Sequence, residues 1–165
     1  MKAVVLAFAC LTVALPPHAL CAATKVSFAH PENYTDANLY GGYGTRSWQP
    51  AVNAIGAYLK RLGDRYLDRR QVLTIDVVDI DLAGYIDPLR PNAYNIRILR
   101  DGTWPRIKVR YSLAQDGRPL RRGEETIASV DYLTNASARF SSDPLRYEKA
   151  MLEEWVRARF VGTGH

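Results

Sequence analysis

The stretch QVLTIDVVDIDLA, from Gln71 to Ala83, alternates apolar and polar residues as a half-buried β-strand does, and the alternation changes phase once. A β-bulge at Val77 and Val78 would return all of its apolar residues to one face of a sheet. The same bulge would align the aspartates of the stretch on the opposite face. These aspartates are Asp76, Asp79 and Asp81. The sequence therefore predicts a bulged strand with one buried side and one acidic side.

The segments around this strand have their own regular patterns. The expected elements are a short strand at Lys25–Phe28, a helix at Pro50–Asp68, a strand from Arg106 to Leu113 that turns at Asp116-Gly117, a return strand from Arg118 to about Tyr132, and a helix at Asp143–Val161 with Asp143 as its N-cap. The first helix is recognised by apolar residues at alternating steps of three and four. Residues 84–104, which contain Pro88 and Pro91, are expected to form turns.

This order of elements predicts the fold class. We expect an α+β domain, a two-layer sandwich in which a mostly antiparallel sheet of four or five strands carries the two helices on one face. The predicted core consists of the apolar residues on the inner faces. They are Val52, Ile55, Leu59, Leu62, Ile75, Val77, Ile80, Ile107, Val109, Leu152 and Trp155.

Residues 1–23 have the pattern of a secretory signal peptide. Lys2 precedes an apolar run from Val4 to Leu15, and small residues precede the expected cleavage point after Ala23. The run is shorter than the about 20 residues that a membrane-spanning helix needs, so we expect no transmembrane segment after cleavage. A lipoprotein is not favoured, because the large residue Leu20 precedes Cys21. We therefore expect a periplasmic protein whose single domain spans residues 24–165.

Four separated segments carry a resemblance to a known family. They are PENYTD at 31–36, VDIDLAG at 78–84, TWPRIK at 103–108 and YLTNASARFSSDPLRYEKAML at 132–152. In this order the chain resembles the DUF3016 family of exported bacterial proteins of unknown function, from about Lys25 to Val161. The resemblance implies export and a single domain, and it supplies no activity, ligand or catalytic residue.

Composition argues against several classes of enzyme. Cys10 and Cys21 both lie in the expected signal peptide, so the remaining chain has no thiol for a disulfide, a nucleophile or a metal site. Only His30 and His165 remain as histidines once His18 is removed, which is too few for an ordinary zinc site and leaves little choice for a catalytic triad. The sequence thus predicts no cofactor.

The aspartate row has two interpretations. Asp76, Asp79 and Asp81, with Asp87 as a further candidate, could bind a hard cation such as calcium through oxygen ligands. The favoured interpretation is charge compensation within the sheet, because the strand that follows presents basic residues on its polar face. These basic residues are Arg106, Lys108 and Arg110.

A loop at residues 31–49 gathers aromatic residues among glycines, and loops of this length are often functional. We expect its aromatic residues to fold back over the core, and to provide the contact surface together with Trp104. The candidate binding residues are Tyr40, Tyr43, Trp48 and Trp104. The net charge of +5 is mild and the basic residues are interleaved with acidic ones, so nucleic acid is not expected as a partner.

Two classes of function remain. The favoured one is a non-enzymatic binding or envelope-assembly module whose partner is an unknown envelope protein or polymer. The alternative is a cell-envelope hydrolase that uses paired carboxylates. Its candidate residues are Asp76, Asp79, Asp81, Glu124 and Glu125. The two classes are distinguished by whether these carboxylates are paired with the basic strand or gathered in a cleft without basic partners.

Overall fold

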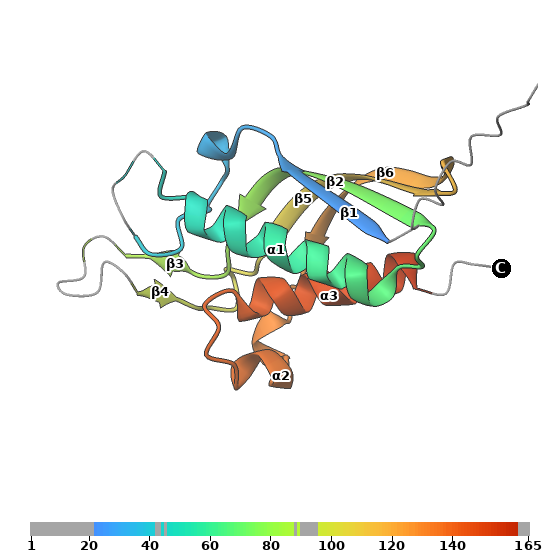
Figure 1. Ribbon diagram of the computed structural model, residues 1–165. Helices are drawn as coiled ribbons and strands as arrows, with labels where there is room; N and C mark the ends of the chain where they lie inside the picture. Colours follow the sequence, from blue (N-terminus) through green and yellow to red (C-terminus); the bar gives the residue numbers. More distant parts are fainter. Residues whose placement is uncertain (1–21, 42–43, 45, 88, 90–95, 162–165) are drawn as a thin grey trace, which may run out of the picture.

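The computed structural model describes residues 22–41, 44, 46–87, 89 and 96–161 of the chain (Figure 1). The strands are β1 (Ala23–Phe28), β2 (Gln71–Asp81), β3 (Tyr85–Ile86), β4 (Arg97–Ile98), β5 (Arg106–Gln115) and β6 (Arg118–Ala128). The α-helices are α1 (Gln49–Tyr66), α2 (Ala136–Arg139) and α3 (Arg146–Phe160), and short 3-10 helices lie at Pro31–Asn33 and Tyr132–Thr134.

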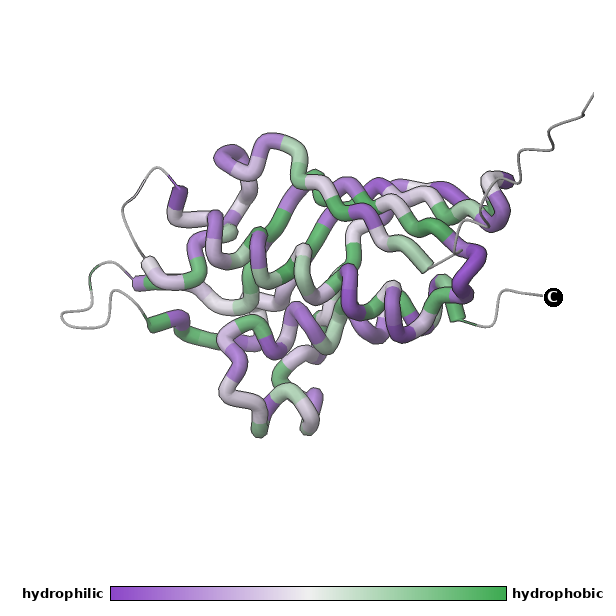
Figure 2. The backbone as a smooth tube through the Cα atoms, in the orientation of Figure 1, coloured by the Kyte–Doolittle hydropathy of each residue, from purple (hydrophilic) through white to green (hydrophobic). Residues whose placement is uncertain are grey.

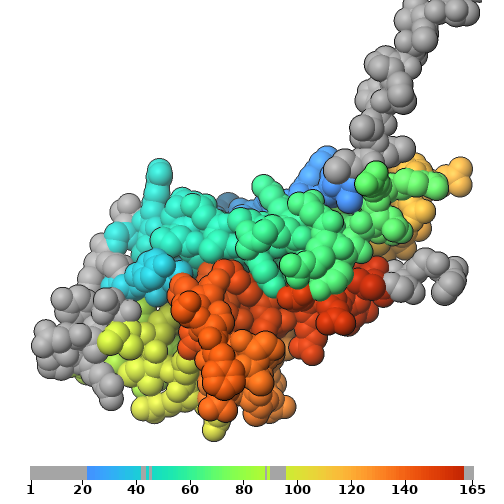
Figure 3. Space-filling model, turned by 60° about the horizontal axis from the view of Figure 1, so that its bottom comes forward, coloured from blue at the N-terminus to red at the C-terminus, as the bar shows by residue number. Residues whose placement is uncertain are grey.

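Four strands form the main sheet in the order β1-β2-β5-β6. β1 runs parallel to β2, whereas β2, β5 and β6 are antiparallel to one another. Helices α1 and α3 lie side by side on one face of this sheet (Figures 1 and 3). The predicted α+β class is confirmed at this level.

The bulge predicted from the phase change is present. The pairing of β2 with β5 shifts between Val77 and Asp79, so Val78 is the extra residue. Beyond the bulge, apolar residues return to the inner face, and Ile80 is fully buried. Every residue of the predicted core is buried in one cluster between the sheet and the two helices. Figure 2 shows the resulting alternation of hydrophobic and hydrophilic residues along the strands.

The helix boundaries differ from the prediction at the start of α3. Asp143 was expected to cap this helix, but the residue before its first turn is Leu145. The Asp143 carboxylate instead accepts a hydrogen bond from the backbone N–H of Leu145 at 2.8 Å, which closes a turn ahead of the helix. The N-cap prediction is therefore wrong by two residues, and Pro144 lies in the turn.

Residues 84–104 are more regular than expected. Their described part contains β3 and β4, which pair as a separate two-stranded sheet. Strands of two residues leave no periodicity in a sequence, which is why the pattern predicted only turns.

Helix α1 packs closely on β1. A side chain at Gly63 would overlap the hydroxyl of Thr24, and one at Gly56 would lie 3.1 Å from the ring of Phe28. The two glycines therefore allow the helix to approach the strand. No helix in the described ranges combines the length and the hydropathy that crossing a membrane requires.

Candidate functional site

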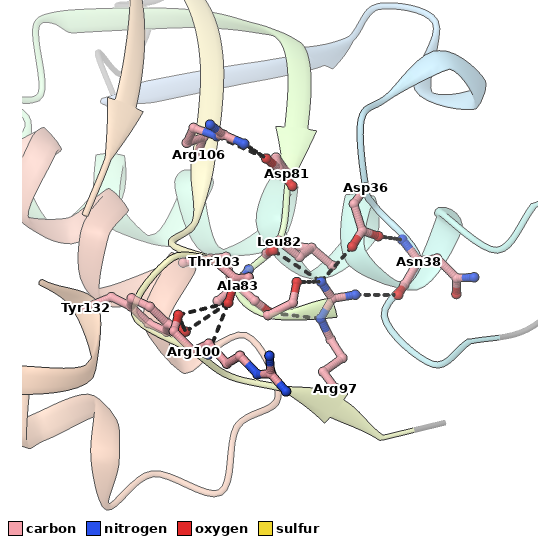
Figure 4. A network of polar contacts seen from close by, with 12 residues as sticks. Asp36, Asn38, Asp81, Leu82, Ala83, Arg97, Arg100, Thr103, Arg106 and Tyr132 are labelled. Atoms are coloured by element: carbon pink, nitrogen blue, oxygen red, sulfur yellow. Dashed lines mark hydrogen bonds and ion pairs between the residues drawn. The ribbon is translucent and has the colours of Figure 1, made fainter. Parts of the chain in front are cut away.

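One arginine ties three segments together at the end of the main sheet. Arg97, on β4, is nearly buried, and its Nη2 lies 2.6 Å from a carboxylate oxygen of Asp36. Its remaining hydrogen bonds go to backbone carbonyls. The acceptors are Ala83 at 2.9 Å, Asn38 at 3.0 Å, Leu82 at 3.1 Å and Gly84 at 2.8 Å. Figure 4 shows how this guanidinium joins the loop at 36–38 to the end of β2.

The chain conformation around Arg97 depends on one glycine. Gly84 has a φ of 76°, and its backbone N–H donates to the carbonyl of Thr103 at 2.9 Å. A side chain there would lie 2.5 Å from the carbonyl oxygen of Ile98. Glycine is thus required both by the left-handed backbone and by the close approach of β4.

A pocket of about 270 Å³ opens beside this network. Its lining residues come from the loop after residue 38, the end of β2, β4 and the start of α3. They are Leu39, Tyr40, Ala83, Ile96, Arg97, Leu99, Pro144, Arg146 and Tyr147. These segments adjoin one another on the face shown in Figure 3. The lining is mostly apolar, and Tyr40 and Ile96 are each 56% exposed at the rim.

Arg146 is a charged group of this pocket that still has hydrogen-bonding capacity. Its guanidinium stacks over the ring of Tyr147, 4.8 Å from the ring centre, and Nη1 donates weakly to the carbonyl of Asp143 at 3.3 Å. The Nε atom is buried and has no partner. Because a guanidinium carries five N–H donors, Arg146 can bind an anionic group that enters the pocket.

A buried carboxyl group lies behind the pocket wall. Glu148 is 2% exposed, and its Oε1 accepts a hydrogen bond of 2.7 Å from the backbone N–H of Ala83. Its Oε2 is buried without a partner. Burial raises the pKa of Glu148 above the ordinary value, and the nearby charges of Arg97 and Arg146 oppose that shift.

The aromatic residues expected to form one contact surface are distributed over separate places. Tyr40 lines the pocket. Trp48 precedes α1 and packs partly buried against the main core, with its indole Nε1 buried and without a partner. Trp104 packs against a smaller cluster that includes Tyr147, and Arg106 lies 5.9 Å from its ring centre. Tyr43 lies outside the described residues.

The aspartate row lies opposite the basic strand, in the expected register. Asp76, Asp79 and Asp81 pair with Arg110, Lys108 and Arg106 respectively. Two of these pairs form ion pairs, since Asp81 contacts Arg106 and Asp76 lies 3.8 Å from Arg110.

The third aspartate has a different partner. Asp79 accepts hydrogen bonds from the backbone N–H and the hydroxyl of Thr35, at 2.7 and 2.8 Å. Lys108 instead contacts Glu124 at 2.7 Å. Asp87 accepts a hydrogen bond from the backbone N–H of Leu89 at 3.0 Å. Within the described ranges, no group of three or more histidine, cysteine, aspartate or glutamate side chains is arranged to hold a metal ion.

The two glutamates considered for catalysis also have hydrogen-bonding partners. Glu124 lies on the outer face of the sheet, where hydrogen bonds from Lys108 and Arg110 lower its pKa. Glu125 accepts hydrogen bonds from Tyr111 at 2.7 Å and from Trp155 at 3.0 Å. A hollow of about 580 Å³ on the outer face contains Asp76, Glu124 and their shared partner Arg110.

Sequence reasoning did not identify Arg97, Arg146 or Glu148. Glu148 could have been noticed, because it lies three and four residues before Met151 and Leu152 and so falls on the buried face of the helix. A carboxyl group at such a position is unusual. Arg97 follows a segment that contains Pro88 and Pro91, and nothing in its local sequence marks it as a buried group.

The comparisons with known proteins give a family and no activity. The family model DUF3016, described as a protein of unknown function, matches residues 22–158. No curated protein and no solved structure matches the chain.

Proposed function

The chain belongs to the DUF3016 family, and on that premise we propose that it is an exported periplasmic binding module, with its binding site in the pocket beside Arg97. The observation that carries the proposal is the guanidinium of Arg146, which lines a pocket of mostly apolar residues and forms no ion pair in the described part of the chain. Ligand pockets commonly combine an apolar lining with a few fixed polar groups.

The chemistry of the pocket defines the class of ligand. The apolar lining favours an aliphatic or aromatic group, and Arg146 favours a carboxylate next to it. The C-terminal residue of an envelope protein presents both groups. Arg97 does not compete for the anion, because its donors are already used by Asp36 and by backbone carbonyls. It fixes the shape of the pocket instead.

A pair of small ligands tests this proposal directly. N-acetyl-leucine and its amide differ only in the carboxylate, and their binding can be followed by NMR titration. We expect the carboxylate to bind about tenfold or more tightly than the amide, since a charged hydrogen bond contributes about 1.5–3 kcal/mol. The preference should disappear in Arg146→Met and persist in Arg139→Met, a matched change at an exposed arginine outside the pocket lining.

The result that would overturn the proposal is equal binding of acid and amide by the unmodified protein.

A second experiment seeks the natural partner in cells. It uses a photo-crosslinking residue in place of Tyr40. Its crosslinked product should be lost in Arg146→Met at unchanged melting temperature.

The alternative of a carboxylate-dependent hydrolase has less support. Its candidates on the sheet have basic partners or hydrogen-bonding partners, as Asp81 has in Arg106 and Asp79 in Thr35. A general acid and a nucleophile need a free carboxyl pair at the substrate. The described part of the sheet does not present such a pair.

A further inference from the structure

Three segments far apart in the sequence meet at the end of the molecule opposite β3 and β4 (Figure 1). The turn between α1 and β2 contacts the turn between β5 and β6, because the backbone N–H of Asp116 donates to the carbonyl of Arg70 at 3.1 Å. The side chains of these two residues also form an ion pair. Arg121 of β6 donates to the carbonyl of Arg159 at 2.8 Å, which attaches the end of α3. We call this region the basic end.

The basic end carries exposed arginines whose guanidinium groups form no ion pair or hydrogen bond with the rest of the described chain. They are Arg69, Arg118, Arg122 and Arg157. Two apolar side chains are exposed among them, Leu120 at 54% and Val161 at 46%. Acidic residues are present too, since Asp116 is paired with Arg70 whereas Asp64, Asp68 and Glu154 are exposed.

Several cations elsewhere in the fold are neutralised by carboxylates. Arg97 is paired with Asp36, and Arg106 is paired with Asp81. On the outer face of the sheet, Lys108 and Arg110 share Glu124. Exposed arginines also occur elsewhere, as at Arg46 and Arg139, but at the basic end four of them share the region with two exposed apolar side chains.

The position of β1 connects this end with the N-terminal segment. Ala23, the first residue of β1, pairs with Val72, which follows Gln71 at the start of β2. Gln71 in turn pairs with Gln115, next to the turn between β5 and β6. The N-terminal end of β1 therefore lies at the basic end, and residues 16–22 separate it from the apolar sequence of residues 4–15.

We propose that the basic end binds an anionic lipid surface. The free arginines contact headgroup phosphates, which a guanidinium binds through two parallel hydrogen bonds. Leu120, on the hairpin between them, enters the interface between headgroups and acyl chains. This surface lies apart from the pocket at Arg146, so the proposal does not rest on the binding function proposed above.

Vesicle sedimentation tests the proposal with the full chain, expressed with its own N-terminal segment and purified in the form that the host produces. The protein should bind vesicles that contain phosphatidylglycerol or lipid A, and should bind phosphatidylcholine vesicles much more weakly. Binding should decrease as salt is raised from 0.05 to 0.5 M, because salt screens exposed charges.

Variants locate the contact on the molecule. Arg69→Gln with Arg118→Gln should weaken binding by about fivefold for each arginine removed. Arg46→Gln with Arg139→Gln removes the same charge at exposed positions elsewhere and should change binding by less than twofold. Leu120→Ser should weaken binding at high salt, where the apolar contact dominates. All variants carry the same N-terminal segment, so any contribution of that segment to vesicle binding is the same in each and cancels when the variants are compared.

Three results would overturn the proposal. The first is equal binding to anionic and neutral vesicles. The second is an equal loss in the two double variants, which would indicate a general effect of net charge. The third is binding to a soluble polyanion such as a DNA duplex that matches vesicle binding and is unaffected by Leu120→Ser, which would indicate a polyanion instead of a lipid surface.

Discussion

At the scale of single residues, Gly84 is a position where both the backbone conformation and a neighbouring strand exclude a side chain. Its positive φ disfavours any side chain, and a Cβ atom would also press on the carbonyl of Ile98. We expect Gly84→Ala to lower the free energy of unfolding by at least about 2 kcal/mol. Urea denaturation followed by circular dichroism measures this loss.

Gly117 provides the matched control. It has the same φ of 76°, but a Cβ atom there would meet nothing within 4 Å. Gly117→Ala should therefore cost only the backbone strain, about 1 kcal/mol. Equal losses at the two sites would contradict the close approach of β4 to Gly84.

The raised pKa of Glu148 predicts that the stability of the protein depends on pH in an unusual way. Its pKa is raised in the folded protein, so the native state binds the proton more tightly than the unfolded chain does. The contribution of protonated Glu148 to stability is complete below its pKa in the unfolded chain, about 4.5. This contribution is lost as pH rises through its pKa in the folded protein. Glu148→Gln keeps the acceptor for the Ala83 N–H and removes the buried charge. We expect it to raise the free energy of unfolding at pH 7.5 by about 1–3 kcal/mol.

Glu153 on the same helix is the control for this measurement. Hydrogen bonds from Tyr66 and Tyr58 lower its pKa, so its contribution is present above the unfolded pKa and is lost as pH falls. Glu153→Gln should therefore destabilise the protein at pH 7.5. If both variants change the free energy of unfolding at pH 7.5 in the same direction, the assignment of a raised pKa to Glu148 is wrong.

At the scale of elements, the strands and long helices could be predicted because each has an apolar period. The bulge at Val78 was visible as a phase change, and the two helices as apolar stripes. β3 and β4 could not be predicted, because their two residue pairs are held in place by contacts that are distant in the sequence. Arg97 makes most of these contacts, with Asp36, Asn38 and the end of β2.

Arg97 attaches β4 to the loop at 36–38 and to the end of β2, so its replacement should lower the stability of the protein. Arg97→Met removes the hydrogen bonds of the guanidinium and leaves Asp36 without its cation. We expect a loss of about 3–5 kcal/mol in the free energy of unfolding, as when one partner of a buried ion pair is removed. Hydrogen exchange should show the loss first at Asn38 and Gly84. Arg100→Met, at an arginine that packs over Tyr85, should leave exchange at these positions unchanged.

The strand pair β2–β5 leads to a prediction about cations. Asp76, Asp79 and Asp81 have partners on β1, β5 or the loop at residue 35. A calcium ion would have to displace these partners before it could be coordinated. We expect submillimolar calcium to leave the melting temperature unchanged, whereas a reproducible rise of several degrees would indicate a cation site.

At the scale of the whole molecule, the two ends of the sheet differ in chemistry. One end holds the apolar pocket with Arg146, and the other holds the free arginines and the start of β1. Apart from Tyr40, the residues of these two sites were not identified as sites in the sequence, because each site is assembled from three or four segments. Of the candidate aromatic residues that the structure describes, Tyr40 lines the pocket, Trp48 packs partly buried against the main core, and Trp104 packs against the smaller cluster.

The last prediction concerns the N-terminus that the proposed export would produce. Ala22 packs against the core and Ala23 begins β1, while the side chain of Thr24 lies against Gly63 of α1. Cleavage after Ala23 would remove one residue pair from β1 and keep the contact of Thr24 with the helix. If the chain is exported as proposed, intact-mass spectrometry of the protein recovered from a periplasmic extract should show a chain that begins at Thr24. Ala23→Phe should block processing, because the peptidase requires a small residue before the cut, whereas Ala22→Phe should be processed normally. A mature chain that begins at any other residue would contradict this cleavage site.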